Sequence, residues 1–264
     1  MDANVYTQVK TSIKRILKID LINYKDEQMK RRLDSWLVRS HVNTWNEYFT
    51  LVTSDATEQE RFRNYLTINV TEFFRDPSRW EALRQDVMPY LVKNFLDAHR
   101  TDGLKLWSAG CSIGTEPYTV AIMMSDFMPS QKYSLLATDL DREALLKAKS
   151  RGPYSQDDIR NLTASQRQKY ITPAAPFLVK ESVQKNIRFQ EQDLFADQFE
   201  TGFDLIICRN VVIYFTAEAK NVLYAKFHAA LRPGGVLFLG GTEMISGSKD
   251  FGFQNYGISF YKKV

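Results

Sequence analysis

The sequence has 264 residues, of which 44% are hydrophobic and 25% charged, and its formal net charge is +4. This balance predicts one large or two modest folded domains and excludes a largely disordered chain. No stretch approaches the roughly 18 apolar residues that a membrane span needs, and two cysteines are too few for a disulfide framework. We therefore expect buried thiols at Cys111 and Cys208 and a reducing, cytoplasmic location.

Short amphipathic helices are predicted in the first part of the chain, residues 1–68. Apolar residues recur at intervals of three and four, beginning with Val5, Val9, Ile13 and Leu17, which favours helices that pack together as a small bundle. Between Met1 and Ser40 there are nine basic and five acidic residues. This difference equals the net charge of the whole chain, so the predicted helical domain carries the basic excess.

A linker is predicted over residues 69–79, followed by a long helix that ends near Ala98. Asp76 is the expected N-cap of this helix, and Pro77 suits its first turn, where the missing N–H costs nothing. Later apolar positions, such as Trp80 and Leu83, lie on one face. We expect that face to pack on the domain that follows.

From Leu104 onwards, short apolar strands alternate with helices. This alternation predicts an α/β fold with a mostly parallel, Rossmann-like sheet across residues 80–264. Two closing runs on either side of Gly257 favour an antiparallel edge. Two strand-like runs joined by Lys185-Asn186 predict a small inserted β-hairpin subdomain at about residues 165–190.

The loop after the first strand, Gly110 to Glu116, is the candidate ligand site. In an open parallel sheet, ligands bind outside the carboxyl ends of the strands. Gly110 and Gly114 permit a close backbone approach, but the loop ends in Glu116, which would repel a phosphate and attract a cation. The pattern favours a cationic ligand such as S-adenosylmethionine, although Glu116 could also serve only the helix dipole.

A second acid supports this interpretation. Asp139 ends the next strand, 25 residues after Gly114, where a carboxylate can accept hydrogen bonds from both ribose hydroxyls. Capping of the following helix is the alternative role, which we assign to Asp141 instead. The three histidines are scattered without metal-ligand spacing, so we expect no metal.

Several motifs resemble the CheR family of chemotaxis receptor glutamate O-methyltransferases. They are TEFFRD (71–76), WSAGCSIGTEPYTVA, ATDLD, QDLF, FDLIICRNVVIYF and LRPGGVLFLGGTE, in the family's order. The resemblance implies an S-adenosylmethionine-dependent methyltransferase fold preceded by an all-α N-terminal domain. It also implies methyl transfer to glutamate carboxylates of methyl-accepting receptors, with S-adenosylhomocysteine as the product and sensory adaptation as the role.

The resemblance also implies roles for individual residues. The residues that would contact the cofactor are Asn69, Thr71, Arg75, Gly110, Glu116, Asp139, Asp193, Leu194, Arg209 and Asn210. Arg75 would orient a carboxylate and Tyr214 would lie near the transferred methyl group, so these two are the catalytic candidates. The family often has Asn where this chain has Asp193, and the predicted hairpin lacks the glycine of members that bind a receptor pentapeptide. The sequence resembles the pentapeptide-independent branch.

Two other functions are alternatives for this sequence. A base-modifying methyltransferase would bind nucleic acid through the basic N-terminus, but such enzymes carry a D/N-P-P-Y/F motif where this chain has Arg209-Asn210-Val211-Val212. The second alternative is a non-catalytic module that binds S-adenosylmethionine. We expect neither nucleic-acid binding nor membrane insertion. We expect instead that basic residues lie along the acidic receptor bundle; they are Lys10, Lys14, Arg15, Lys18, Arg31 and Arg32.

Overall fold

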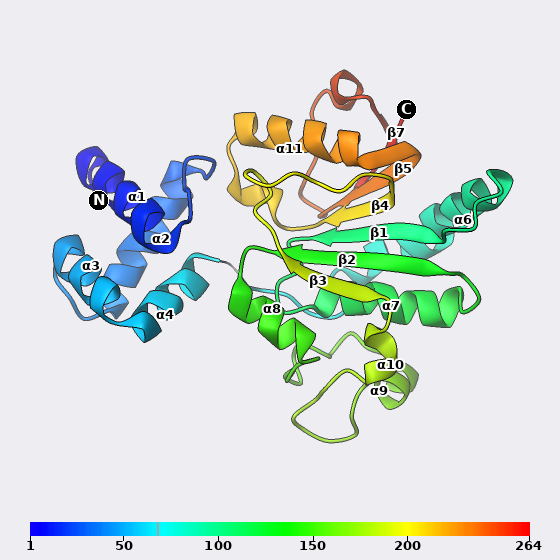
Figure 1. Ribbon diagram of the computed structural model, residues 1–264, viewed down its shortest axis with the longest axis horizontal. Coiled ribbons are helices and arrows are strands. Elements are labelled where there is room, and N and C mark those ends of the chain that lie inside the picture. The colour runs from blue at the N-terminus through cyan, green and yellow to red at the C-terminus, as the bar shows by residue number, and fades with distance from the viewer. Residues whose placement is uncertain (68) are drawn as a thin grey trace. The chain divides into compact units, whose positions relative to one another are not determined.

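Helices alone build the N-terminal part of the computed structural model, which describes residues 1–67 and 69–264 (Figure 1). Ile68, at which the predicted helical domain ends, lies outside the described residues. The chain divides into two units, one of Met1–Ile68 with Tyr214–Val222 and one of Asn69–Ile213 with Leu223–Val264. Within the described residues, no helix is both long and apolar enough to cross a membrane.

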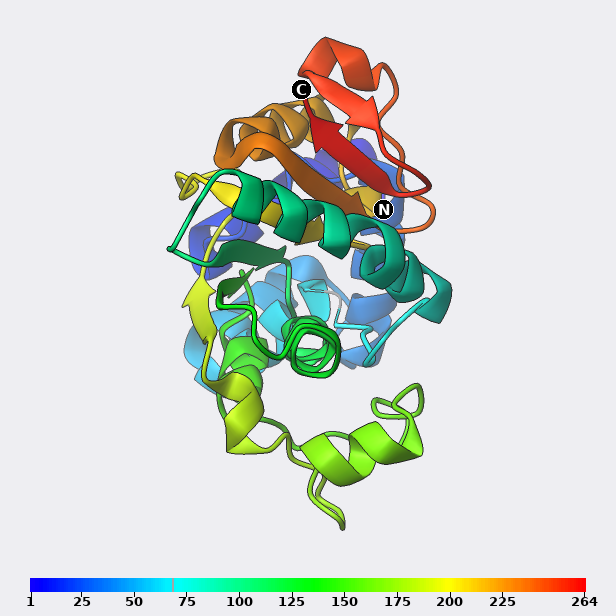
Figure 2. The ribbon, with the colours of Figure 1, turned by 90° about the vertical axis from the view of Figure 1, so that its right-hand side faces the viewer.

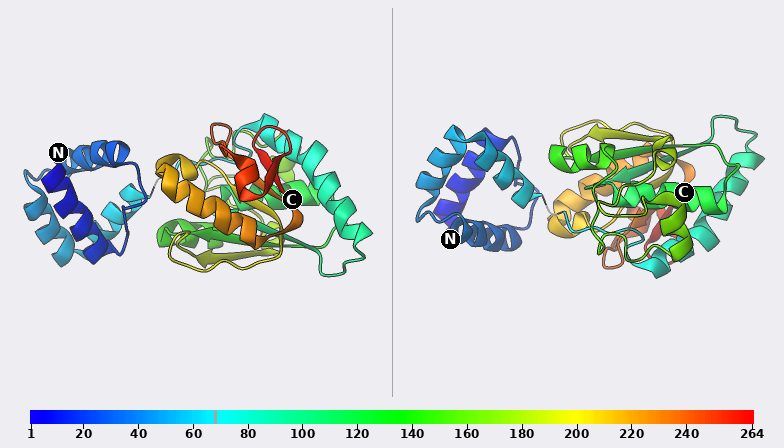
Figure 3. Two further views of the ribbon diagram at one scale, coloured as in Figure 1. Left: turned by 90° about the horizontal axis from the view of Figure 1, so that it is seen from above. Right: turned by 90° about the horizontal axis from the view of Figure 1, so that it is seen from below.

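The helices of the first unit are α1 (Ala3–Leu17), α2 (Asp26–Arg39), α3 (Trp45–Ser54) and α4 (Ala56–Leu66) (Figure 3). Side-chain caps define the starts of α1 and α3: Asp2 accepts from the Val5 N–H, and Thr44 forms a capping box with Glu47. The buried stripe of α1 consists of Tyr6, Val9, Ile13 and Leu17, which confirms the predicted amphipathic pattern. Stacked and edge-on aromatic rings, with Trp36 and Phe62 5.5 Å apart, fill the bundle.

The second unit contains a seven-stranded sheet in the order β3-β2-β1-β4-β5-β7-β6. The strands are β1 (Leu104–Ala109), β2 (Tyr133–Asp139), β3 (Ile187–Glu191), β4 (Phe203–Cys208), β5 (Leu231–Leu239), β6 (Phe253–Asn255) and β7 (Phe260–Lys263). Strands β1 to β5 pair in parallel, and β7 pairs antiparallel with β5 and β6. The predicted mostly parallel sheet with an antiparallel edge is confirmed.

Helices cover both faces of this sheet. Helix α7 (Thr115–Phe127) and the run α5 (Pro77–Ala82), η1 (Leu83–Val87) and α6 (Met88–Asp97) pack on one face around β1 and β4 (Figure 2). Helix α11 (Ala217–Ala230) lies along the sheet (Figure 1). The ring centroids of its Phe227 and of Trp107 on β1 are 5.6 Å apart. Both cysteines are buried, as predicted.

Within the inserted segment at about residues 165–190, the predicted hairpin of the two runs joined by Lys185-Asn186 is wrong. The segment contains α9 (Ala164–Tyr170) and α10 (Glu181–Gln184), and its described antiparallel pairings are the single bridges Tyr154–Phe177 and Ile171–Val179. Ile187–Glu191 is instead β3, an edge strand parallel to β2. A parallel neighbour needs a long crossover, which α8 (Arg142–Lys149) and the segment after it provide.

Asp76 is the N-cap residue of α5 and Pro77 lies in its first turn, as predicted, but the Asp76 side chain does not cap the helix. Asp76 lies in the left-handed region at φ 59°, and its side chain makes no capping hydrogen bond. Its Oδ2 instead lies 2.8 Å from Nη2 of Arg209, whose side chain is only 2% exposed. A buried guanidinium without a carboxylate is far more costly than an uncapped helix end. The helix predicted here is interrupted by the π-helical turn η1.

Candidate active site

Two glycines shape the loop between β1 and α7. Gly110 and Gly114 have φ values of 83° and 90°, in the left-handed region. A Cβ at Gly114 would lie 2.8 Å from Cβ of Ala148, and one at Gly110 would lie 2.5 Å from Cγ2 of Val211. The loop is therefore packed directly against α8 and against the loop that follows β4.

Replacing Gly114 by alanine should destabilise the protein by about 2 kcal/mol, because the substitution combines left-handed backbone strain with overpacking against Ala148. Thermal unfolding of the purified protein measures the effect as a lower Tm. Gly241→Ala is the matched control, since nothing lies within 4 Å of its added Cβ. An equal Tm for the two variants would contradict the packing argument.

Glu116 lies in the first turn of α7 with 12% of its side chain exposed. Its Oε1 accepts a hydrogen bond from Ser108 Oγ at 2.7 Å, and its Oε2 lies 4.0 Å from Nη1 of Arg209. Desolvation by the surrounding protein raises the pKa of Glu116 to about 7, although Arg209 opposes the shift. A cation placed beside this carboxylate would stabilise its ionised form.

Asp139 ends β2 and shapes the same loop. Its Oδ2 accepts from the backbone N–H of Ser112 at 2.7 Å, and its Oδ1 accepts from that of Asp141 at 2.9 Å. Desolvation raises the pKa of Asp139 to about 6 despite these backbone hydrogen bonds. Asp141 caps α8 by accepting from the Ala144 N–H, as predicted.

The segment that starts at Asn69 makes hydrogen bonds to the loop after β1, to the start of α7 and to the N-cap residue of α8. Asn69 donates to Asp141 Oδ2 and accepts from Ser112 Oγ, each at 2.7 Å. Farther along, the hydroxyls of Thr71 and Thr115 lie 2.5 Å apart. The segment 69–75 is thus fixed beside Glu116 and Asp139 in the sheet unit.

Arg209, which directly follows β4, is the central cation of the site. Its guanidinium lies against the rings of Trp80 and Phe238, which also contact each other, and donates to the backbone carbonyl of Arg75 at 3.0 Å. Its buried Nε has no hydrogen-bond partner among the described residues. The Arg75 side chain donates to the Val70 carbonyl at 2.7 Å.

A buried acid that the motif analysis did not single out lies next to this loop. Glu243 is 3% exposed and accepts hydrogen bonds from the backbone N–H groups of Gly240, Asn210 and Ile213. It follows a strand and two glycines. An acid just beyond a predicted strand was the signal that identified Asp139, and it also applies here.

The candidate adenine side follows β3. Gln192 donates its N–H to the Asp139 carbonyl at 2.9 Å, which places Asp193 next to the end of β2. Oδ1 of Asp193 accepts from the N–H groups of Phe195 and Ala196. The Leu194 carbonyl accepts from Lys226 Nζ at 2.6 Å. Sequence reasoning also missed Lys226, because only the fold brings α11 to this loop.

The structure therefore joins eight predicted site residues through a continuous set of contacts within the sheet unit: Asn69, Thr71, Arg75, Gly110, Glu116, Asp139, Arg209 and Asn210. Asp193 and Leu194 adjoin them through Gln192. Tyr214 belongs to the other unit, where its carbonyl accepts from the Lys25 N–H at 2.9 Å. Among the described residues, no three histidine, cysteine or acidic side chains are grouped to hold a metal ion.

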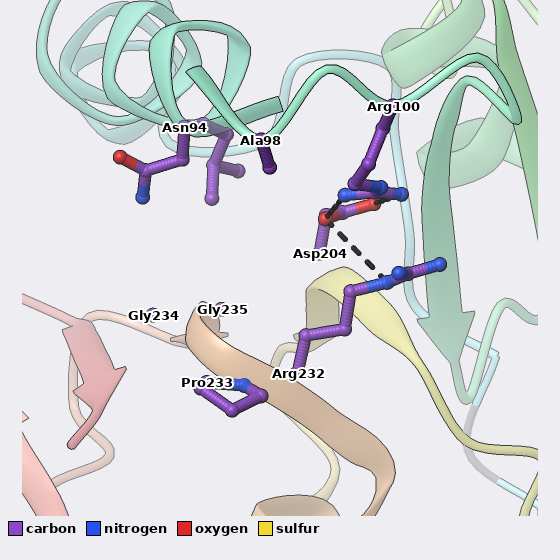
Figure 4. A pocket seen from close by; sticks show the side chains of 9 residues that line it. Asn94, Ala98, Arg100, Asp204, Arg232, Pro233, Gly234 and Gly235 are labelled. Carbon is purple, nitrogen blue, oxygen red and sulfur yellow. Dashed lines mark hydrogen bonds and ion pairs between the residues drawn. The ribbon is translucent and has the colours of Figure 1, made fainter. Parts of the chain in front are cut away.

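A pocket of about 260 Å³ lies at the opposite edge of the sheet, at the amino ends of the strands (Figure 4). Asp204 at its wall accepts from Arg100 Nη1 at 2.5 Å and from the Lys105 N–H at 2.8 Å. Arg232 Nε lies 3.8 Å from the same carboxylate. The charged groups pair with one another, which fits a structural role.

Comparison with known proteins identifies the family. Residues 69–261 match the family description "CheR methyltransferase, SAM binding domain", and residues 4–67 match "CheR methyltransferase, all-alpha domain". The chain belongs to the CheR methyltransferase family. It is 41% identical over 253 residues to a chemotaxis protein methyltransferase of Listeria monocytogenes, covering 96% of this chain and 94% of that protein. It is 31% identical over 258 residues to one of Borreliella burgdorferi, covering 91% and 90%.

Membership in the CheR family confirms the predicted fold class and identifies the chain as an S-adenosylmethionine-dependent methyltransferase. The residues present fit that cofactor. Glu116 and Asp139 are carboxylates with raised pKa values, and a cationic group beside Glu116 and hydroxyl donors beside Asp139 would stabilise their ionised forms. In addition, Arg209 offers a buried N–H without a partner among the described residues.

Proposed function

We propose that this CheR-family protein transfers the methyl group of S-adenosylmethionine to glutamate side chains of chemotaxis receptors, forming methyl esters. The observation that carries the proposal is the pair of desolvated carboxylates, Glu116 in the first turn of α7 and Asp139 at the carboxyl end of β2, the strand parallel to β1. Family membership gives the reaction class. The printed names of the relatives, chemotaxis protein methyltransferases, support receptors as the substrates.

Each site residue has a proposed part in holding the donor. Glu116 would pair with the amino group of its methionine portion, and Asp139 would accept from the ribose hydroxyls. Arg209 and Asn210 would lie beneath the methionine portion, with Asn69, Thr71 and Arg75 over the cofactor and Gly110 leaving space for it. Asp193 and Leu194 would border the adenine. When bound, S-adenosylmethionine supplies an electrophilic methyl group on a positively charged sulfur.

The chemistry at the acceptor needs no general base. A glutamate carboxylate has an unperturbed pKa of about 4.3 and is already ionised at neutral pH. The protein has only to orient the carboxylate and exclude water. We assign the orienting role to Arg75, whose guanidinium can hold two oxygens, and a contact near the transferred methyl group to Tyr214.

The product explains a role in sensory adaptation. Each methyl ester removes one negative charge from the receptor. Neighbouring acidic helices of a receptor bundle then repel one another less, by an amount that salt screens. Methylation therefore changes the balance between receptor conformations that differ in helix packing.

Incubation of the purified protein with radiolabelled S-adenosylmethionine and receptor-bearing membranes tests the proposal. Base-labile label on the receptor is the expected result, because methyl esters hydrolyse in alkali. Label on added RNA would support the nucleic-acid alternative instead. Binding of S-adenosylhomocysteine without any transfer would support the non-catalytic module.

The basic residues of the first unit are not equivalent as docking candidates. Lys14, Arg15 and Lys18 are exposed on or just after α1. Arg31 is also exposed, and its Nε donates to the Glu27 carbonyl. Lys14 also pairs with Asp20 but stays exposed. By contrast, Lys10 and Arg32 are only partly exposed; Lys10 pairs with Asp26, and Arg32 lies over the Tyr65 ring. We propose that the exposed group forms a receptor-docking surface and that Lys10 and Arg32 mainly support the helices.

Reversing Lys14, Arg15 and Lys18 to glutamate should raise the KM for receptor by about 3- to 10-fold at low salt and flatten its salt dependence, because electrostatic steering is lost. Initial methylation rates across a salt series provide the measurement. Lys185→Glu, an exposed charge reversal in the sheet unit, is the control. An unchanged KM and salt slope in the triple variant would end the docking proposal.

Independence from a receptor pentapeptide stays a prediction. Its sequence argument depended on the absence of glycine from a hairpin that the structure replaces with α10 and β3. Methylation of receptors with and without the C-terminal pentapeptide, measured at equal concentration, decides the point. Equal rates are expected.

A further inference from the structure

We propose that Glu243 is a positioning residue for the methyl-donor site, because its carboxylate joins the loop after β5 to the loop after β4. The inference rests on the proposed function, since that function places Arg209 and Asn210 at the donor. Glu243 itself is not proposed to touch the donor. It acts on the backbone that carries those two residues.

Three backbone N–H groups converge on this carboxylate. Oε2 accepts from Asn210 at 2.9 Å and from Gly240 at 2.5 Å, and Oε1 accepts from Ile213 at 3.2 Å. Two of these donors belong to the loop after β4 and the third to the loop after β5. One side chain thus replaces the strand pairing that ends between these segments at Cys208 and Leu239.

The backbone of Asn210 needs this support. Its φ is 58°, in the left-handed region, which is less favourable for a residue with a side chain than for glycine. Charge-assisted hydrogen bonds from a buried carboxylate to backbone N–H groups are stronger than neutral ones and offset such strain. Removing the carboxylate leaves buried donors unpaired and favours other backbone conformations at Asn210.

Gly240 leaves space for the carboxylate. A Cβ at this position would lie 2.5 Å from Oε2 of Glu243 and 3.0 Å from the Asn210 nitrogen. The two glycines that precede Thr242 therefore differ, since a Cβ at Gly241 meets nothing within 4 Å. In the turn Gly240-Gly241-Thr242-Glu243, the carboxylate of the last residue accepts the backbone N–H of the first.

The charge of Glu243 also reaches the donor site. Arg209 stabilises the ionised form of Glu243. The charge of Glu243 in turn raises the pKa of Glu116. Burial raises the pKa of Glu243, opposed by the three backbone hydrogen bonds. The site therefore contains a third acid beside Glu116 and Asp139, bound to backbone N–H groups and not available to a ligand.

Glu243→Ala should lower the affinity for S-adenosylhomocysteine by about 10- to 100-fold, measured by calorimetry well below the Tm. Glu243→Gln keeps one acceptor oxygen and presents an amide NH₂ to the remaining N–H, so a smaller loss is expected. Hydrogen exchange of the ligand-free variants should show faster exchange at Asn210 and Ile213. In methylation assays the KM for S-adenosylmethionine should rise while the KM for receptor stays unchanged.

The matched control is Asp204→Asn (Figure 4). Asp204 is another buried carboxylate that accepts a backbone N–H, but it lies at the opposite, amino end of the strands. It should lower the Tm without changing affinity. Wild-type affinity in Glu243→Ala, or a loss no larger than in Asp204→Asn, would overturn the inference. Should Glu243→Ala not fold, Glu243→Gln decides by the same criteria. Failure of the wild-type protein itself to bind S-adenosylhomocysteine would overturn the proposed function instead.

Discussion

Asp139→Ala should weaken the binding of S-adenosylhomocysteine by about 100-fold or more, because two charge-assisted hydrogen bonds to ribose would be lost together. The variant also removes the acceptors for the Ser112 and Asp141 N–H groups, so the loop after β1 loses its own support. Calorimetric titration with S-adenosylhomocysteine measures the loss. The heat should fall below detection at ligand concentrations that saturate the wild-type protein.

Glu191→Ala provides a control at the neighbouring position in the sheet. Glu191 is the register partner of Asp139 on β3, but it is exposed and pairs with Arg142. Its replacement should change the affinity by less than about twofold, as for other surface ion pairs. If Asp139→Ala also bound like the wild-type protein, the proposed ribose contact would be wrong.

The affinity for S-adenosylhomocysteine should rise between pH 6 and pH 8, and Glu116→Gln should remove the part of this rise centred near pH 7. Without ligand the pKa of Glu116 is raised to about 7, so near neutral pH a large fraction of the carboxyl is protonated. A ligand ammonium favours the carboxylate, so binding lowers this pKa and releases protons. At pH 8 the variant should bind about tenfold more weakly, through loss of a charged hydrogen bond.

Calorimetry in two buffers of different ionisation enthalpy measures the proton release directly. The groups that act on Glu116 are Arg209, Ser108, Glu243 and Arg75, and the variant leaves all of them in place. Asp139, whose pKa is raised to about 6, should account for the linkage that remains. Equal proton release by the variant and the wild-type protein near pH 7 would contradict the assignment.

The stability of the ligand-free protein should depend on pH in the opposite direction. The folded-state pKa of Glu116 lies above its ordinary value of 4.5, so the folded protein holds the proton more tightly than the unfolded chain. This contribution to stability is present at low pH and is lost as the pH rises through about 7. Glu116→Gln should therefore show a smaller fall in Tm between pH 5 and pH 8.

Much of the candidate site was predictable because its residues follow local patterns. A buried strand followed by a glycine loop and a helix defines a ligand-binding turn, which led to Gly110 and Glu116. An acid at the end of the next parallel strand led to Asp139. The carboxyl ends of parallel strands lie at the same end of a sheet. Residues that follow two neighbouring strands are therefore expected to lie close together.

Other features depended on partners distant in the sequence. Asp76 has the local pattern of an N-cap, but its carboxylate pairs with Arg209, 133 residues away. Ile187–Glu191 alternates as a hairpin strand would, but β2 offers an unpaired edge with matching register. The roles of Lys226 and Glu243 also arise only where separate loops meet.

By itself, the sequence determined the helical N-terminal part, the α/β alternation and the acids that face a cationic ligand, since periodicity, glycine and strand ends are properties of neighbouring residues. The tertiary structure alone decided which strand occupied the sheet edge and which acids were taken up by protein partners. The physical reason is that buried charges and open strand edges are satisfied by whatever lies close in space. Separation along the chain places no limit on those partners.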